Sequence, residues 1–312
     1  MDYGILPRMI RRLIAAGLCM FALTGCAREE ATPKKAAATA ERKTLLIGLI
    51  PERNIFKQIE RYQPLAVYLS RETGMKVVLK ILPRYGNIID NFRSAGMDGA
   101  FFGSFTYALA HAKLGVEALA RPVALDNTST YHGLIFVRKD SGITSVRQMK
   151  GKRFAYVDKA TTAGYLFPQD YLHRHGVSNC EEYLKECYFT GTHEDAIEDV
   201  LNKKADIGAA KNTEFDRLAR SNPRVRKELV VLSRSLDVPE NGIALRKDID
   251  ASLRKRVKEA LLNMHRDADG KKVLEQFGAQ RFIETTNQDY GVVLRYTENI
   301  GLDLSTFDYT ND

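Results

Sequence analysis

The sequence has no tryptophan, only four cysteines among 312 residues, and no compact block of lysine and arginine. Without a basic block interleaved with aromatic residues, the formal net charge of +8 is too diffuse to indicate a nucleic-acid-binding surface, although it suits the attraction of small anions. After residue 25 no long uncharged apolar run occurs, so no membrane-spanning helix is predicted there. We therefore expect no nucleic-acid partner.

Motifs that mark catalytic and metal centres are also missing. The chain has no Gly-x-Ser-x-Gly elbow, no His-Glu-x-x-His motif and no phosphate-loop lysine motif. Asp158, His193 and Glu194 can be combined into an acid–base set, but no nucleophile joins them. His173 and His175, at the end of a predicted helix, indicate solvated side chains and not metal ligands. We expect no catalytic residue, cofactor or metal, and an enzyme is kept only as the alternative from another class.

The N-terminal stretch is organised like a secretory signal. Three arginines precede an apolar run at residues 13–23, which is too short to span a bilayer comfortably. The run ends in Leu-Thr-Gly-Cys, which resembles the bacterial lipobox, where the signal peptide is cut before the cysteine and the thiol is acylated. We expect residues 1–25 to be removed and Cys26 to anchor the protein to a membrane. A plain signal peptide or a short membrane anchor is the alternative, and inner or outer membrane stays open.

Residues 26–43 are polar, alanine-rich and without apolar periodicity, which predicts a flexible tether. With Cys19 in the signal peptide and Cys26 acylated, the two remaining cysteines are Cys180 and Cys187. In an oxidising compartment they can form a disulfide across a short loop. Two small buried side chains in a reduced protein are the competing interpretation, and both stay open.

The folded part begins near Thr44 and shows two successive α/β patterns. In the first pattern, apolar strands are expected at 44–51, 76–82 and 99–103, with helices at 62–70 and 88–94. In the second, strands at 153–157, 186–189 and 205–210 alternate with helices at 164–175 and 194–201. This order is typical of open α/β sheets, and two such units predict two lobes.

An internal echo suggests how the chain passes between the lobes. Gly133–Asp140 is similar to Gly242–Asp248, and the two segments bracket the second α/β pattern. If the chain crosses from one lobe to the other at these segments, lobe one consists of residues 44–136 and 246–312, and lobe two of 137–245. One continuous domain with two similar edge strands is the alternative.

Four stretches in this order are similar to a known family: YHGLIFVRKDSGI at 131–143, DKATTAGYLFP at 158–168, GTHEDA at 191–196 and ADIGAAKNTE at 205–214. With them, the chain from about Thr44 to Ile283 resembles the periplasmic phosphonate-, phosphite- and phosphate-binding proteins of ABC transporters. The resemblance implies the type II periplasmic-binding-protein fold, an α/β sandwich of two lobes with two crossover hinge strands. It also implies a monomer in the periplasm that captures a small oxyanion between the lobes for an ABC permease. Coupling to a membrane sensor protein is the alternative.

The turn Thr161-Thr162-Ala163-Gly164 is expected between a strand and a helix. Amides at a helix start point outward and carry partial positive charge, and threonine hydroxyls donate as well. In the family, a Ser/Thr-rich turn followed by glycine contacts the phosphonyl oxygens, and Ala163 stands where a third hydroxyl is usual. We expect Thr161, Thr162 and the amide of Ala163 to bind the oxyanion; an ordinary helix cap is the alternative.

Five further positions are candidates around this turn. The resemblance implies that His193 donates to the anion and that the phenol of Tyr131 reaches into the cleft; helix capping and lobe-edge packing are the alternatives. In the facing lobe, Ser104 and Tyr107 follow an apolar strand, and Asn54 follows the first strand. Ligands of open α/β sheets bind beyond the carboxyl ends of the strands, where these residues are expected.

The segment Lys211-Asn212-Thr213-Glu214 bears on the ligand. We expect Asn212 in the site. Family members that bind aminophosphonates use an acidic residue nearby for the ligand's amine, whereas here Lys211 intervenes, although Glu214 is close. If Lys211 faces the cleft, it favours a plain dianion or a substituent with extra negative charge; if it faces solvent, it carries no such information. Phosphate, phosphite, methylphosphonate, larger phosphonates and sulfonates all stay open as ligands.

Overall fold

The computed structural model describes residues 44–50, 55–82 and 88–311. The predicted signal peptide, the predicted acylation site Cys26 with its tether, and Asn54 lie outside the described residues. In the described ranges, every helix is too short or too polar to cross a bilayer.

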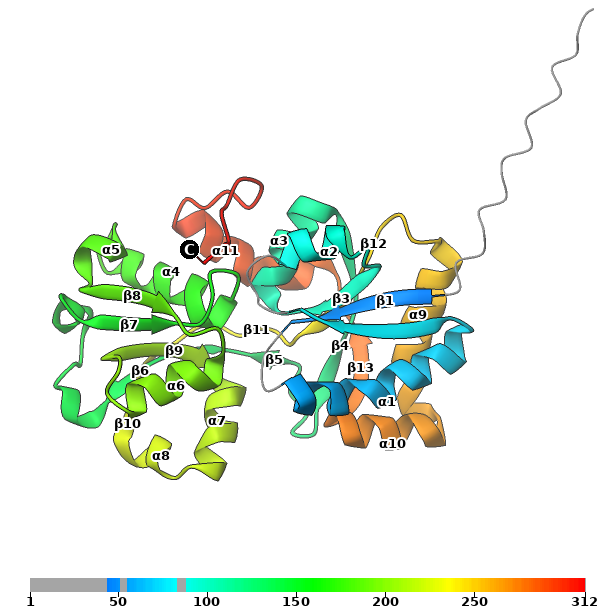
Figure 1. Cartoon of the computed structure of the whole chain (residues 1–312), viewed down its shortest axis with the longest axis horizontal. Helices are drawn as coiled ribbons and strands as arrows, with labels where there is room; N and C mark the ends of the chain where they lie inside the picture. The colour runs from blue at the N-terminus through cyan, green and yellow to red at the C-terminus, as the bar shows by residue number, and fades with distance from the viewer. Residues whose placement is uncertain (1–43, 51–54, 83–87, 312) are drawn as a thin grey trace, which may run out of the picture. The chain divides into compact units, whose positions relative to one another are not determined.

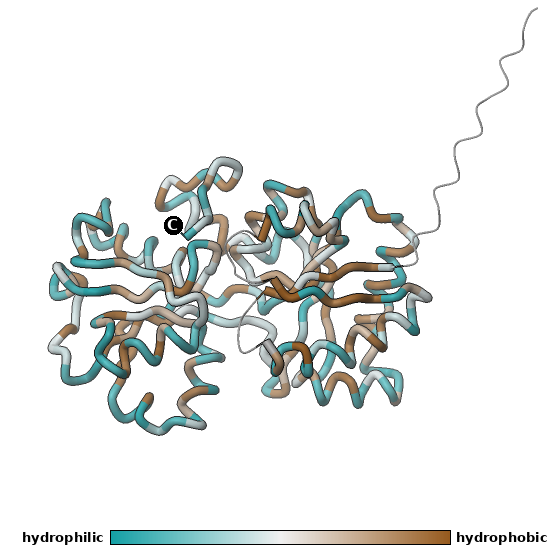
Figure 2. The backbone as a smooth tube through the Cα atoms, viewed as in Figure 1, coloured by the Kyte–Doolittle hydropathy of each residue, from teal (hydrophilic) through white to brown (hydrophobic). Residues whose placement is uncertain are grey.

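Six strands form the first sheet, in the order β13-β4-β12-β3-β1-β2 (Figure 1). β1 pairs in parallel with β2 and β3, whereas β12 and β13 run antiparallel to their neighbours. Apolar residues are concentrated along its central strands (Figure 2), as expected for strands covered on both faces. The strands are β1 (Thr44–Leu49), β2 (Lys76–Ile81), β3 (Gly99–Phe102), β4 (Val116–Ala124), β12 (Gly242–Arg246) and β13 (Ala279–Glu284).

Helices cover both faces of this sheet. Leu45, Ile47 and Leu49 of β1 pack in one core with α1 (Ile55–Thr73), α9 (Ala251–Asn263) and α10 (Ala268–Phe277). The opposite face packs with α2 (Ile88–Ser94) and α3 (Ser104–Leu114). α1 begins earlier than the expected helix at 62–70. Its first turns leave apolar residues exposed, Phe56 by 76%, so the burial periodicity that predicts a helix is weak there.

Five strands form the second sheet, in the order β10-β6-β9-β7-β8. β7 is parallel to β8 and β9, and β6 is antiparallel to β9 and β10. The strands are β6 (Gly133–Arg138), β7 (Arg153–Tyr156), β8 (Glu186–Phe189), β9 (Ile207–Lys211) and β10 (Leu229–Arg234). The helices around it are α6 (His193–Leu201), α7 (Asn212–Ser221) and α8 (Arg224–Glu228), and, on the other face, a π-helical turn (Thr162–Leu166) continued by α4 (Phe167–Arg174), with α5 (Cys180–Tyr183). Both predicted α/β patterns are therefore confirmed.

Two chain segments connect the sheets, and they pair with each other. β5 (Thr130–Tyr131) precedes β6, β11 (Val238–Pro239) precedes β12, and the two form a short antiparallel ladder. β6 is paired throughout within the second sheet and β12 within the first. The pairing thus places the crossings just before the two similar segments, while the lobe boundaries given above stay a prediction.

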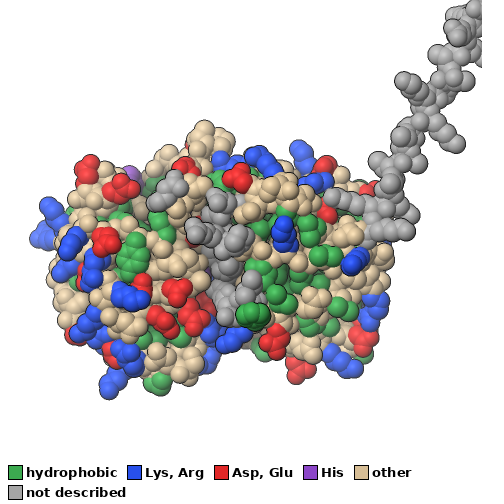
Figure 3. Space-filling model, viewed as in Figure 1, with side chains coloured by type: hydrophobic (Ala, Val, Ile, Leu, Met, Phe, Trp, Pro, Cys, Tyr) green, Lys and Arg blue, Asp and Glu red, His purple; other side chains and the backbone are tan. Residues whose placement is uncertain are grey.

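The chain ends with α11 (Gly291–Asn299) and an extended segment that contacts elements around both sheets. The Tyr309 hydroxyl lies 3.1 Å from an Asp90 carboxylate oxygen of α2, and Asn311 binds Asp158 beyond β7. Single-turn 3-10 helices complete the fold at Lys139–Ser141, Val146–Met149, Met264–Arg266 and Asn287–Tyr290. On the face shown in Figure 3, basic and acidic side chains are interspersed.

Candidate functional site

A small pocket lies where the ends of strands from both sheets meet helix starts. We refer to it as the inner pocket; its volume is about 10 Å³, close to the space of one water molecule. Five of the predicted site residues line it, namely Thr161, Thr162, Ala163, His193 and Tyr131. The other lining residues are Ile50, Gly103, Thr106, Lys211 and Asn241.

The threonine turn joins an extended residue to a helix start. Thr161 is extended (φ −104°, ψ 141°), and the π-helical turn starts at the next residue. The Thr161 hydroxyl donates to the carbonyl of Asp158 at 2.7 Å, which closes the turn. A Cβ at Gly164 would lie 2.4 Å from Val157 Cβ and 2.8 Å from Thr161 Oγ1, so only glycine lets the turn pack against the strand end.

The turn meets α3 of the first sheet directly. The Phe105 amide, in the first turn of α3, donates to Thr162 Oγ1 at 2.9 Å. The Thr162 and Ser104 hydroxyls hydrogen-bond the Tyr131 phenol, and burial raises the pKa of Tyr131 above its usual value of 10.0. The phenol is therefore neutral at physiological pH and keeps a proton that it can donate.

His193 begins α6 and is buried beside the turn. The Lys211 amide donates to His193 Nδ1 at 3.3 Å. A ring nitrogen that accepts a hydrogen bond carries no proton, so in the neutral imidazole the proton is on Nε2. In that tautomer the Nε2–H group lies on the opposite side of the ring from the Lys211 amide.

Asn241 lines the inner pocket immediately before β12 and was not predicted. Its side chain is only 5% exposed, and its Nδ2 donor has no hydrogen-bond partner among the residues that the structure describes. A buried donor without an acceptor costs about 1–3 kcal/mol, so this atom indicates an acceptor supplied by a ligand. The internal echo gave no signal for it, because it aligns Asn241 with His132, which does not line the inner pocket.

Helix starts surround the pocket. α3, the π-helical turn, α6 and α7 all begin at or next to lining residues. Amides of a first helical turn lack internal acceptors, and the helix dipole adds partial positive charge at this end. Together with the Asn241 donor and the threonine hydroxyls, they make the inner pocket complementary to a small oxyanion.

Three other predicted residues lie outside the lining. Tyr107 points away from the pocket: its ring stacks on Tyr290 with 4.0 Å between centroids, and its hydroxyl accepts from the Ala118 amide. One residue of helix turns a side chain by about 100°, so Thr106 faces the pocket and Tyr107 does not. The structure therefore does not place Tyr107 in the lining of the inner pocket.

Ser104 and Asn212 support the site from outside. The Ser104 hydroxyl donates to the Pro239 carbonyl at 2.6 Å, which ties α3 to β11. Asn212 Oδ1 accepts from the His132 amide at 2.9 Å, which ties the end of β9 to the start of β6. Both side chains hold the crossing segments against the lobes, and neither lines the inner pocket.

Cys180 and Cys187 are free thiols in the structure, so the disulfide interpretation does not describe it. The Cys180 thiol donates instead to Gln169 Oε1 at 3.0 Å. Burial raises the pKa of Cys180 to about 11 and that of Cys187 to about 12. The alternative of two partly buried, reduced side chains matches these features.

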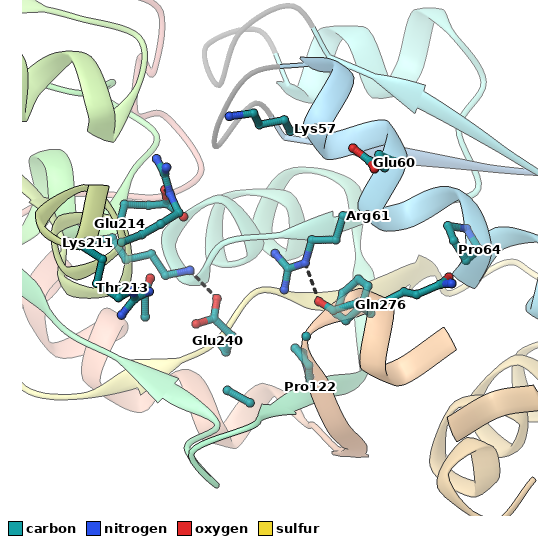
Figure 4. Close-up of a pocket in the computed structure, with 15 residues that line it drawn as sticks. Lys57, Glu60, Arg61, Pro64, Pro122, Lys211, Thr213, Glu214, Glu240 and Gln276 are labelled. Carbon is teal, nitrogen blue, oxygen red and sulfur yellow. Dashed lines mark hydrogen bonds and ion pairs between the residues drawn. The ribbon is translucent and has the colours of Figure 1, made fainter. Parts of the chain in front are cut away.

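A larger groove of about 870 Å³, the outer groove, adjoins the inner pocket, and Lys211 lines both. Figure 4 shows Lys211 and Glu214 on one side of the groove and Lys57, Glu60 and Arg61 of α1 on the other. Lys211 is 4% exposed, so it faces the cleft and not solvent. The lining residues are Lys57, Glu60, Arg61, Pro64, Pro122, Ala124, Lys211, Thr213, Glu214, Arg217, Arg220, Glu240, Gln276, Phe277 and Gly278.

Several known proteins are similar to this chain. The phosphonates-binding periplasmic protein of Escherichia coli (strain K12) is 26% identical over 247 residues, which cover 78% of this chain and 72% of that protein. The phosphate-import protein PhnD of Mycolicibacterium smegmatis (strain ATCC 700084 / mc(2)155) is 25% identical, covering 67% and 68%. The structure of PhnD1 from Prochlorococcus marinus (MIT 9301) in complex with methylphosphonate superposes with a TM-score of 0.72 at 20% identity, covering 83% of this chain and 99% of that one.

The structural likeness confirms the predicted two-lobed type II periplasmic-binding-protein fold. The family model described as "ABC transporter, phosphonate, periplasmic substrate-binding protein" matches residues 47–290, most of the chain. The protein therefore belongs to the family of periplasmic substrate-binding proteins of phosphonate ABC transporters, which bind their substrates and are not enzymes.

Proposed function

We propose that the protein captures a small phosphorus oxyanion (phosphonate, phosphite or phosphate) in the inner pocket and delivers it to an ABC permease. The observation that carries the proposal is the buried, unpartnered Nδ2 donor of Asn241 among several helix starts. The relatives support the ligand class, since they are named for phosphonates and phosphate and one was solved with methylphosphonate. A transport role is favoured over a sensor role because the family is one of transporter components.

In this proposal, the polar residues of the two facing turns and of the crossing segment contribute hydrogen-bond donors. The oxyanion accepts from the hydroxyl of Thr162, the amide of Ala163, the His193 ring and the Tyr131 phenol, with Asn241 Nδ2 from the crossing segment. The Thr161 hydroxyl takes part only when its single hydrogen turns from the Asp158 carbonyl to the oxyanion. Charge-assisted hydrogen bonds of this kind contribute about 1.5–3 kcal/mol each. No protein cation is needed in direct contact, because helix starts already supply positive potential.

In this proposal, the two lobes must move apart before an oxyanion can enter the inner pocket. A phosphorus oxyanion is larger than the 10 Å³ of the inner pocket, and the Phe105–Thr162 hydrogen bond joins the two facing turns. We propose that the lobes, 44–136 with 246–312 against 137–245, move apart about the β5 and β11 crossings, and close again with the oxyanion in place of that contact.

The substitution Asn241→Asp tests the site. The variant keeps the shape of the side chain but replaces the unpartnered donor by a carboxylate, which repels an oxyanion. We expect the dissociation constant for methylphosphonate, measured by calorimetry, to rise at least about a hundredfold, the sum of a lost charged hydrogen bond and a like-charge contact. Asn287→Asp, at an exposed position in a 3-10 turn, is the matched control and should leave it unchanged. Equal affinity of Asn241→Asp and the natural protein would rule out the inner pocket as the binding site.

We also propose that the chain is exported and held on a membrane through acylated Cys26, with residues 26–43 as its tether. Each buried methylene of an acyl chain contributes about 0.8 kcal/mol, so a multiply acylated cysteine holds firmly. Cys26→Ser should move the protein from the membrane fraction to the soluble fraction and remove the lipid mass from its N-terminus. Cys19→Ser should leave both unchanged. The same membrane fraction for natural protein and Cys26→Ser would argue against this anchor.

A further inference from the structure

Lys211 is placed where the inner pocket meets the outer groove. It ends β9, lines both cavities, and its buried side chain extends toward Glu240 (Figure 4). Its ammonium forms an ion pair with Glu240 and lies 4.4 Å from the ring centroid of Tyr131. The ammonium is therefore held by a carboxylate on the crossing segment and by the face of an aromatic ring that itself lines the inner pocket.

An aromatic face next to a carboxylate is a binding site for an organic cation. Here the chain's own ammonium occupies that site, directly beside the inner pocket. A ligand amine at this position would meet a like charge in a largely desolvated place, and it would find the Glu240 carboxylate already paired. The arrangement thus disfavours a cationic substituent next to the oxyanion.

The outer groove, into which a substituent would extend, has an excess of positive charge. Two of its cations are paired with carboxylates, through Lys211–Glu240 and Arg217–Glu214. The other charged residues that line the groove form no ion pair within the described ranges. They are three cations and one carboxylate, so the net charge of this group is positive: Lys57, Arg61, Arg220 and Glu60. With about 870 Å³, the groove also has room for a substituent of several atoms.

We infer that the site selects a phosphonate whose substituent carries a negative charge, and that Lys211 is the specificity-determining residue. Lys211 fills the position that a substituent amine would take, and an anionic substituent is attracted by the cations of the outer groove. The inference rests on the proposed function, because it takes the phosphonyl group to lie in the inner pocket.

Three phosphonates that differ only at the end of a two-carbon linker test this. The end group is a carboxylate in 3-phosphonopropionate, a methyl in propylphosphonate and an ammonium in 2-aminoethylphosphonate. By calorimetry at pH 7.5 we expect 3-phosphonopropionate to bind about tenfold more tightly than propylphosphonate, and propylphosphonate at least about tenfold more tightly than 2-aminoethylphosphonate. The carboxylate of 3-phosphonopropionate gains affinity from the cations of the outer groove. The ammonium of 2-aminoethylphosphonate loses affinity because it meets the desolvated Lys211 ammonium, which has the same charge.

Substitution of Lys211 should invert the order. Lys211→Ala empties the cation position and leaves Tyr131 and Glu240 to receive a ligand amine, so 2-aminoethylphosphonate should become the tightest of the three. A purely structural role of Lys211 would weaken all three ligands alike. Arg220→Ala, at an exposed position of the groove, should reduce only the advantage of the carboxylate, by about threefold, and provides a second test that does not disturb the buried pair. Lys204→Ala, on an exposed lysine outside both cavities, should change none of the three affinities.

The outcomes separate the inference from the proposed function. Equal affinities of the three ligands in the natural protein, or a preference for the amine, overturn the inference while the oxyanion site stands. An unchanged order in Lys211→Ala overturns the role of Lys211. If neither these ligands nor methylphosphonate, phosphite and phosphate bind, the proposed function fails, and the inference fails with it.

Discussion

At the scale of single residues, the site combines two kinds of polar group. Asn241 Nδ2 is a buried donor without a partner in the described part of the chain, whereas the Lys211 ammonium is held by Glu240 and the Tyr131 ring. The Asn241 donor is available for a hydrogen bond to a ligand. The Lys211 ammonium already has its partners, and it contributes positive charge next to the place where a ligand would bind. Hence we assign oxyanion binding to Asn241 and selectivity to Lys211.

The two thiols lead to a prediction on reactivity. Burial raises the pKa of Cys180 to about 11 and of Cys187 to about 12, and the thiolate is the reactive form. At pH 8 the native thiols should react with a disulfide reagent at least about a hundredfold more slowly than in urea, where the pKa is about 8.5. Labelling sites are read by mass spectrometry. The rate in the native protein should rise with pH up to these values.

The raised pKa values of the two thiols also determine how the free energy of unfolding changes with pH. Because the folded pKa values exceed the unfolded ones, the thiols leave stability unaffected below about pH 8.5 and lower it as pH rises toward 11, where the unfolded chain releases protons first. A pair that labels only after reduction would instead show a disulfide and contradict the free thiols.

The lining of the inner pocket could be predicted where it follows a local pattern. Thr161, Thr162 and His193 stand at strand-to-helix turns, and such turns meet at one edge of a sheet whatever the rest of the chain does. Tyr107 was misplaced because one residue of helical phase decides which side chain faces the pocket. Asn241 was missed because a short turn before a strand has the same composition whether it faces solvent or a cleft.

At the scale of elements, the C-terminal segment packs against both facing turns. The Phe307 ring lies 5.8 Å from the Phe105 ring of α3 and 6.4 Å from the Tyr165 ring of the π-helical turn, between centroids. Asn311 Oδ1 accepts from the Lys159 amide at 3.0 Å, next to the threonine turn. The segment therefore braces the two elements that form opposite walls of the inner pocket.

Phe307→Ala should lower the free energy of unfolding by about 1–3 kcal/mol, measured by urea denaturation, because it removes a partly buried ring from between two others. Phe56→Ala, with a side chain that is 76% exposed, is the matched control and should change stability by less than about 0.5 kcal/mol. Equal effects of the two substitutions would mean that the segment does not brace the lobes.

The helices and strands were predictable from apolar runs and turn residues, since β1, β3 and β9 are buried strands bounded by helix starts. The two crossing segments were harder to predict. Their ladder, β5 with β11, is two residues long and pairs segments far apart in the sequence, so no local periodicity reveals it. The sequence echo therefore located the neighbouring strands, β6 and β12, instead of the crossings.

At the scale of the whole molecule, the two sheets are held by the crossings, the C-terminal segment and contacts between facing turns. The Phe105–Thr162 hydrogen bond joins the two facing turns, and in our proposal it breaks when the cleft opens. A ligand that bridges the same turns replaces such contacts, so binding and stability are coupled.

The most direct test of the oxyanion site is calorimetric titration of the purified, refolded protein, freed of ligand, with methylphosphonate, phosphite, phosphate and sulfate. We expect at least one phosphorus oxyanion to bind with one site per chain. At 100 times its dissociation constant it should stabilise the folded state by about 2.7 kcal/mol. The absence of heat for every oxyanion, with a folded protein confirmed by its thermal transition, would contradict the account and show that this member of the family binds another class of ligand.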